Sequence, residues 1–201
     1  MELNAKQKRQ KILLEIKDIL TGTAFPLMLQ LVLSASVILF ADTQGEPAIQ
    51  AFALVVGEIM LIGAYVIFGR QNGTSAYRKT VIANKKREIS PDDAELLYRT
   101  GEYAVWKGVV IGAVSAIPFI LFQFIQCIAP NLFCEFILKY AFGWAAYPFK
   151  VMGVQTEWLN FIWIVIPIAV HTASYIWGGY GERKRQALLE KAQEIKDKKK
   201  K

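Results

Sequence analysis

Residues 104–126, AVWKGVVIGAVSAIPFILFQFIQ, form a long apolar stretch with a single charged side chain near its start. About 20 such residues in a helix are enough to cross the roughly 30 Å of hydrocarbon in a bilayer. Small residues recur here at every fourth position: Ala104, Gly108, Gly112 and Ala116. On a helix they form one row, along which a neighbouring backbone can approach closely. Gly and Ala are common in membrane helices generally, but four in register favour a helix-packing seam.

Apolar residues make up 54% of the 201-residue chain and occur in blocks that charged segments separate. Four blocks have the length of a membrane span. They are residues 24–41, 48–68, 104–126 and 159–177. The sequence therefore predicts an all-α integral membrane protein, a four-span helical bundle with its membrane domain in 23–177. The 23 residues before the first block carry eight charges and are too long for the first part of a signal peptide, so that span is expected to stay.

The N-terminal segment 1–22 has the pattern of an amphipathic helix. Its apolar residues recur with helical spacing, and Gly22 is the expected helix end. These apolar residues are Ile12, Leu13, Ile16, Ile19 and Leu20. A basic helix with one apolar face beside a span is typical of a helix that lies in the headgroup plane, so we expect an interfacial helix. A helix that binds a partner protein is the alternative.

Two longer connections separate the later spans. Segment 69–103 is basic; it opens with GRQNGTS, which predicts a flexible turn, and Ser90-Pro91 predicts the start of a helix. Segment 127–158 contains an aromatic stretch, 132–149, that Glu135, Lys139, Gly143 and Pro148 interrupt. Charges and a Pro–Gly break are unfavourable in backbone that faces lipid. We therefore expect an outer interfacial or re-entrant hairpin, with its aromatic side chains at the headgroup level.

Basic residues predict how the spans are oriented. Lys and Arg number five before the first span, seven in 69–103 and nine in the tail 178–201. The segments 42–47 and 127–158 hold none and two. By the positive-inside rule, both termini and 69–103 are cytoplasmic. A fifth span in 132–149 would place one basic terminus outside.

The net charge of +7 is explained by these segments, because basic residues beside spans attract the anionic headgroups of the bilayer. No recognised nucleic-acid-binding module accompanies the charge, so nucleic acid is not an expected partner. Self-association or a membrane partner protein is expected instead. The short loops suit a multi-pass protein of a bacterial cytoplasmic membrane.

Glu58 is the one carboxylate well inside a predicted span, and such groups normally face the bundle interior with a partner. His171, the only histidine, lies at a similar distance from the outer side of its own span, within a few ångströms in depth at 1.5 Å per residue. Ser34, Ser36 and Ser115 fall at the same depth. This polar layer could bind a proton, a cation or a polar substrate. Alternatively, Glu58 only fixes the packing of the helices.

Cys127 and Cys134 follow the third span on the predicted outer side, where a disulfide is chemically permitted. Two free thiols are equally compatible with their spacing. The sequence has no phosphate-binding loop, no catalytic motif and no metal-spaced Cys/His set, so we expect no cofactor or metal and least favour an enzyme.

Two functions remain. The first is a non-enzymatic packing or accessory subunit of a membrane assembly, which would pack against itself or a partner through the face from Ala104 to Ala116. The second is a small transporter or channel component that uses Glu58 and His171. A single carboxylate and a single histidine are a thin polar lining for transport, and this favours the first function.

Overall fold

The computed structural model describes residues 5–43, 46–89, 103–153 and 156–199, and in these ranges the chain is helical without a strand. Its elements are α1 (Ala5–Thr43), α2 (Pro47–Ile89), α4 (Val105–Ile128), α5 (Leu132–Ala141), α6 (Gly143–Ala146), α7 (Pro148–Val151), the 3₁₀ helix η1 (Glu157–Ile164) and α8 (Val165–Lys198). Four helical stretches are long and apolar enough to cross a membrane, and each overlaps one predicted span. The prediction of an all-helical chain with four such stretches is confirmed.

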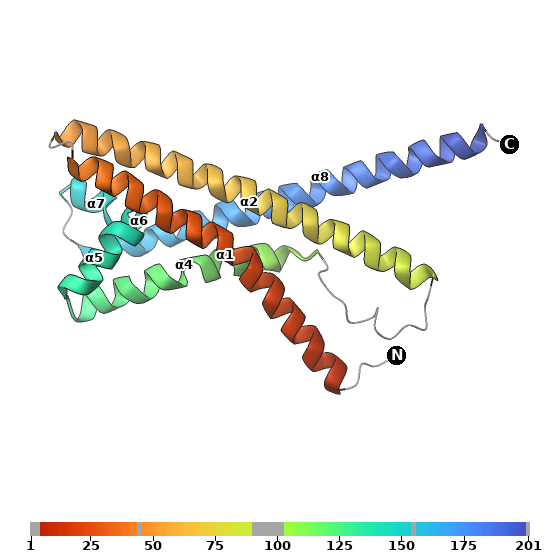
Figure 1. Ribbon diagram of the computed structural model, residues 1–201, viewed down its shortest axis with the longest axis horizontal. Coiled ribbons are helices and arrows are strands. Elements are labelled where there is room, and N and C mark those ends of the chain that lie inside the picture. The colour runs from red at the N-terminus through yellow and green to blue at the C-terminus, as the bar shows by residue number, and fades with distance from the viewer. Residues whose placement is uncertain (1–4, 44–45, 90–102, 154–155, 200–201) are drawn as a thin grey trace.

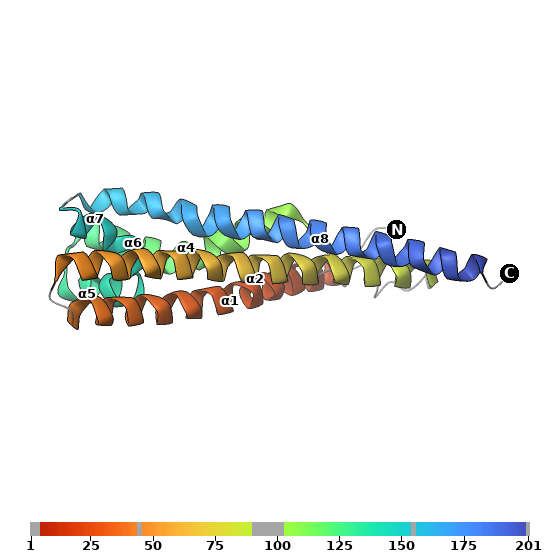
Figure 2. The same cartoon turned by 90° about the horizontal axis from the view of Figure 1, so that it is seen from above.

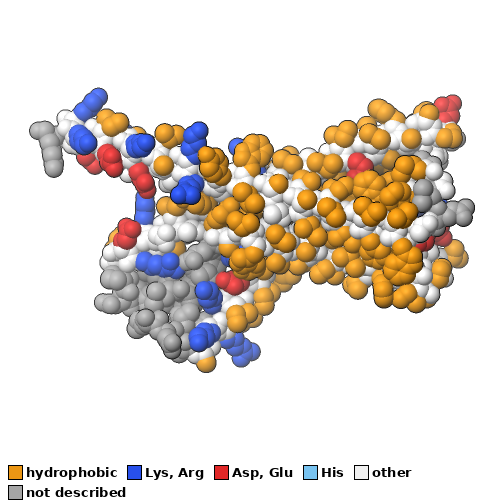
Figure 3. All heavy atoms as spheres, turned by 180° about the vertical axis from the view of Figure 1, so that it is seen from behind, with side chains coloured by type: hydrophobic (Ala, Val, Ile, Leu, Met, Phe, Trp, Pro, Cys, Tyr) orange, Lys and Arg blue, Asp and Glu red, His pale blue; other side chains and the backbone are white. Residues whose placement is uncertain are grey.

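The four long helices form one elongated bundle, in which α2 lies between α1 and α8 (Figure 2). Their outward faces carry large apolar side chains, and Figure 3 shows hydrophobic side chains covering this part of the molecule. Examples more than half exposed are Phe25, Leu39, Phe52, Ile59 and Leu121. So large an apolar surface is unusual for a protein in water and is what a bilayer would cover. This surface and the four membrane-length helices are those of a multi-pass membrane protein.

Helix α1 is longer than predicted, because it continues through Gly22 into the first span. The expectation that Gly22 ends a separate helix in 1–22 is wrong. A methyl group at Gly22 would contact the Ile111 side chain on α4, and Asn72 on α2 donates a hydrogen bond to the Gly22 carbonyl at 3.2 Å. The missing side chain at Gly22 thus lets α1 pack closely on its neighbours.

Helix α2 is also unbroken from Pro47 to Ile89, so the predicted turn in 69–75 is wrong. The glycines of this stretch lie instead where α2 and α8 cross. A methyl group at Gly73 would overlap the backbone carbonyl of Tyr175, and one at Gly178 would overlap the backbone of Arg70. Glycine therefore brings the two backbones together here, as in close-packed membrane helix pairs. The helix start predicted at Ser90-Pro91 lies outside the described residues.

Beyond this crossing, three helix ends diverge from the same end of the bundle (Figure 1). We call them the arms: residues 5–20 of α1, 76–89 of α2 and 183–198 of α8. The tail predicted at 178–201 is thus the continuation of α8 as far as Lys198.

An ion pair joins α2 and α8 where the arms begin. Arg78 Nε lies 3.0 Å from Glu182 Oε1, and the second guanidinium nitrogen bonds Glu182 Oε2 at 3.1 Å. The Glu182 side chain is only 3% exposed, and it also accepts a hydrogen bond from Gln186 at 2.9 Å. The hydrogen bond from Arg78 lowers the pKa of Glu182. A bidentate pair of this kind fixes the direction in which the two arms leave the bundle.

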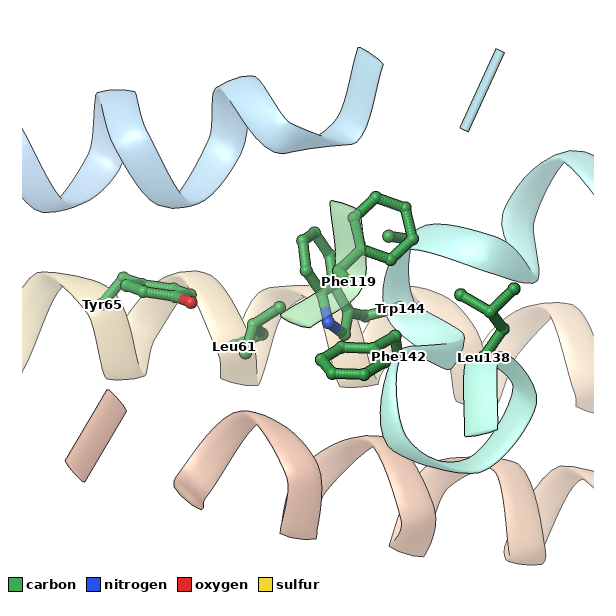
Figure 4. Packing of buried hydrophobic residues seen from close by; sticks show 7 residues of the cluster. Leu61, Tyr65, Phe119, Leu138, Phe142 and Trp144 are labelled. Carbon is green, nitrogen blue, oxygen red and sulfur yellow. The ribbon is translucent and has the colours of Figure 1, made fainter. Parts of the chain in front are cut away.

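At the opposite end of the bundle, α5 and α6 fold back between the long helices. Phe142 and Trp144 are buried, and both pack on Phe119 of α4, with ring centres 6.0 and 5.7 Å away (Figure 4). Leu61 of α2 belongs to the same hydrophobic cluster. Phe142 and Trp144 of the aromatic stretch therefore pack inside the protein. Phe133 and Phe136 of the same stretch are exposed.

Candidate functional site

Tyr65 of α2 lies at the centre of a buried polar cluster. It is 1% exposed, and its hydroxyl donates a hydrogen bond to Gln30 Oε1 on α1 at 2.9 Å. The Tyr65 oxygen also lies 3.3 Å from Ser115 Oγ on α4, and Ser115 donates to the Gly112 carbonyl at 2.7 Å. Three helices thus meet through polar side chains in the middle of an apolar bundle.

His171 brings the fourth long helix, α8, to this cluster. Its ring is fully buried and lies edge-on to the Tyr65 ring, with 6.3 Å between the ring centres. Within the described structure, neither imidazole nitrogen has a hydrogen-bond partner. A buried polar group that gains no hydrogen bond costs about 1–3 kcal/mol.

Glu58 lies in a second polar group, beside a cavity between α1 and α2. Both carboxylate oxygens are buried and have no hydrogen-bond partner among the described residues. The cavity, of about 270 Å³ with its open side, is also lined by Gln30, Ser34 and Trp144. Gln30 Nε2 and Trp144 Nε1 are likewise buried donors without a partner. Unpaired donors and an unpaired acceptor thus line one narrow cavity, whose chemistry and size suit at most a single water molecule.

The predicted polar layer is therefore divided into two groups. Glu58 and Ser34 line the cavity, whereas Ser115 and His171 surround Tyr65, and Gln30 contacts both groups. Ser34 Oγ accepts a hydrogen bond from the Gly143 backbone N–H at 2.7 Å, which ties α6 to α1. Ser36 does not join either group: it is exposed and bonds the Val32 carbonyl of its own helix at 2.8 Å.

Sequence reasoning missed Gln30, Tyr65 and Trp144. Gln30 precedes Ser34 by one helical turn, and Tyr65 follows Glu58 by two, so each shares a helix face with a residue that was singled out. That spacing was a usable signal for Gln30 and Tyr65. No comparable signal marks Trp144, because its place depends on how α6 folds back.

The row of small residues on α4 packs inside the bundle. A methyl group at Gly108 would meet the Tyr175 side chain, and one at Gly112 would meet the backbone of Ile168, both on α8. Ala116 is fully buried, and Ala104 is the residue before α4 begins. Because α8 of the same chain packs on Gly108 and Gly112, these glycines serve the packing of the bundle itself, and the use of this face by a second molecule stays a prediction.

Both cysteines are free thiols in the structure, and Cys134 is buried. Cys127 lies beside Gln123 Nε2, with 3.7 Å between nitrogen and sulfur. Of the two alternatives for this pair, the structure thus has the free thiols. Among the described residues, no group of three or more His, Cys, Asp or Glu side chains is placed to hold a metal ion.

These features define a class: a multi-span helical membrane protein with buried polar side chains at the centre of its bundle. Comparison with protein-family models, with curated proteins and with solved structures finds no match for this chain.

Proposed function

We propose that this chain is a non-enzymatic accessory subunit of a membrane assembly, which holds a partner protein through its three arms. The observation that carries the proposal is the length of the helices. Helix α2 has 43 residues, about 65 Å at 1.5 Å per residue, roughly twice the thickness of the hydrocarbon core. About half of α2 therefore extends beyond the lipid, and the arms of α1 and α8 extend from the same end of the bundle (Figure 1). A bundle that served only to span the membrane would need no such extensions.

The arms combine basic residues with apolar side chains that nothing in the described structure covers. Nine large apolar side chains on them are more than 45% exposed: Ile12, Leu13, Ile16, Leu20, Ile82, Ile89, Leu188, Leu189 and Ile195. Each Å² of apolar surface left in water forgoes about 25 cal/mol. A partner with an apolar groove and an acidic rim would cover the apolar residues and pair with the neighbouring Lys and Arg. The positive-inside rule places this partner in the cytoplasm.

Purification in mild detergent, followed by native mass spectrometry, tests this function. We expect a stoichiometric partner protein to remain bound. The double variant Leu188→Ser, Leu189→Ser should lose that partner, because it removes two adjacent apolar side chains from the α8 arm. Gln193→Ser on the same arm is the matched control and should keep it, because Gln193 is exposed and is neither apolar nor charged. A wild-type chain that purifies alone would contradict the proposal.

A second candidate function is transport of a proton or a small cation, and it draws support from the unpartnered carboxylate of Glu58 and the unpartnered imidazole of His171. Ionisable groups in the interior of a membrane bundle commonly belong to ion pathways. Flux through proteoliposomes that hold the purified chain would test it. If the chain is a transporter of this kind, Glu58→Gln should abolish the flux. If the flux persists in this variant, Glu58 is not part of the ion pathway.

A further inference from the structure

A second cavity lies where α1, α2, α4 and α8 meet, immediately before the arms diverge. Its volume is about 600 Å³ including its open side. Its polar lining comes from three of these helices and is made of Asp18, Thr21, Asn72, Ser75, Lys79 and Lys107. Ile111 and Tyr175 form its inner wall. The functions proposed above do not use this cavity.

Lys107 is the unusual member of the lining. The residue is only 5% exposed, and no acidic side chain of the described residues forms an ion pair with it. Its ammonium lies 5.8 Å from the centre of the Trp106 ring, at the outer limit of a cation–π contact. A contact that long contributes little to holding the ammonium charge. Among the described residues Lys107 therefore has no anionic partner, and the cavity beside it has room for one.

The other charges in the lining leave the cavity positive. Lys79 Nζ lies 3.2 Å from Asp18 Oδ1, so these two charges compensate each other. Lys107 then supplies one net positive charge. Thr21 and Ser75 are exposed, and their hydroxyl groups can donate hydrogen bonds from the cavity rim. One ammonium and several neutral donors suit an anion with one negative charge and several acceptor oxygens, as in a phosphodiester.

The polar lining residues of α1, α2 and α4 place this cavity near one end of the predicted spans. Asp18 and Thr21 precede the first span, Asn72 and Lys79 follow the second, and Lys107 lies at the start of the third. By the positive-inside orientation this level is the cytoplasmic headgroup region. Basic pockets between membrane helices on this side are suited to anionic headgroups.

We propose that Lys107 and the surrounding cavity bind a phosphate group, supplied by the headgroup of an anionic phospholipid in the cytoplasmic leaflet. Native mass spectrometry of the full chain in detergent, titrated with phosphatidylglycerol or with phosphatidylcholine, tests the binding. We expect one phosphatidylglycerol to stay bound. In Lys107→Gln its affinity should fall about tenfold or more, as expected when a charge-assisted hydrogen bond is lost. Lys107→Arg should retain binding, because it keeps the charge and the donors.

Lys184→Gln is the matched control, since it removes an exposed basic residue from α8 away from the cavity, and it should leave the affinity unchanged. In a parallel series, inorganic phosphate is added to the purified chain and its binding is measured as a rise in the melting temperature. This series distinguishes free phosphate from a lipid headgroup as the source of the anion. If inorganic phosphate binds only when Lys107 is present, and phosphatidylglycerol binds no better than phosphatidylcholine, the anion site is supported. The proposal that a lipid supplies the phosphate is then overturned. Equal loss of affinity in Lys107→Gln and Lys184→Gln, or no binding of either anion by the wild-type chain, would overturn the site itself.

Discussion

Gly73→Leu is expected to separate α2 from α8 and to unfold the bundle at temperatures where the wild-type chain is intact. A side chain at residue 73 would occupy the position of the Tyr175 backbone carbonyl, and a backbone cannot move aside as a flexible side chain can. Overpacking of a core costs about 1–3 kcal/mol even where side chains adjust, so we expect a loss above about 3 kcal/mol here. The melting temperature and monodispersity of the purified chain in detergent measure the effect.

Gly63→Leu is the control for this prediction, because Gly63 lies on the same helix and a methyl group there would meet nothing within 4 Å. We expect this variant to purify and melt as the wild-type chain does. If Gly73→Leu melts at the same temperature as Gly63→Leu, then α2 and α8 do not cross at this glycine.

Glu58→Leu is expected to make the protein more stable, by about 1–3 kcal/mol, the usual cost of an unpartnered buried polar group. Among the described residues, neither buried carboxylate oxygen of Glu58 has a hydrogen-bond partner, and the neighbouring Leu54 and Leu61 are apolar. A leucine of similar size would remove the carboxylate and keep the cavity wall filled. The rise in the melting temperature in detergent, relative to wild type, is the measurement.

Glu46→Leu removes the same charge from an exposed position just before α2, and it should change the stability by less than about 0.5 kcal/mol. A fall in the melting temperature of Glu58→Leu would show that Glu58 has a stabilising partner. If Glu58→Leu instead raises the melting temperature and also abolishes a transport activity, Glu58 is a residue kept for function at the expense of stability.

The four membrane-length helices could be predicted because hydrophobic length depends on local composition alone. The ends of the helices could not. Gly22 and Gly73 favour a turn in an isolated sequence, but the same absence of a side chain permits close helix packing, and only the neighbouring helix decides between the two. In this fold a second backbone lies against Gly73, and the helix continues through it.

The polar site could be predicted only in part, for a similar reason. Glu58 and His171 stand out because ionisable residues are rare in apolar segments. Which side chains they face depends on the rotation of each helix about its axis, which the sequence does not state. The structure accordingly brings His171 to Tyr65, while Glu58 shares its cavity with Gln30. Ser36, at the predicted depth, lies on the wrong face of α1 for either group.

The central claim is that the three arms are cytoplasmic, because the partner protein and the lipid at Lys107 both require it. Labelling of single cysteines by a membrane-impermeant maleimide tests this most directly, in a chain whose own thiols are replaced (Cys127→Ala, Cys134→Ala). Glu46→Cys lies in the connection between the first two spans, and Leu188→Cys lies on the α8 arm. We predict that Glu46→Cys is labelled in intact cells and that Leu188→Cys is labelled only after the membrane is permeabilised. Labelling of Leu188→Cys in intact cells would contradict the account.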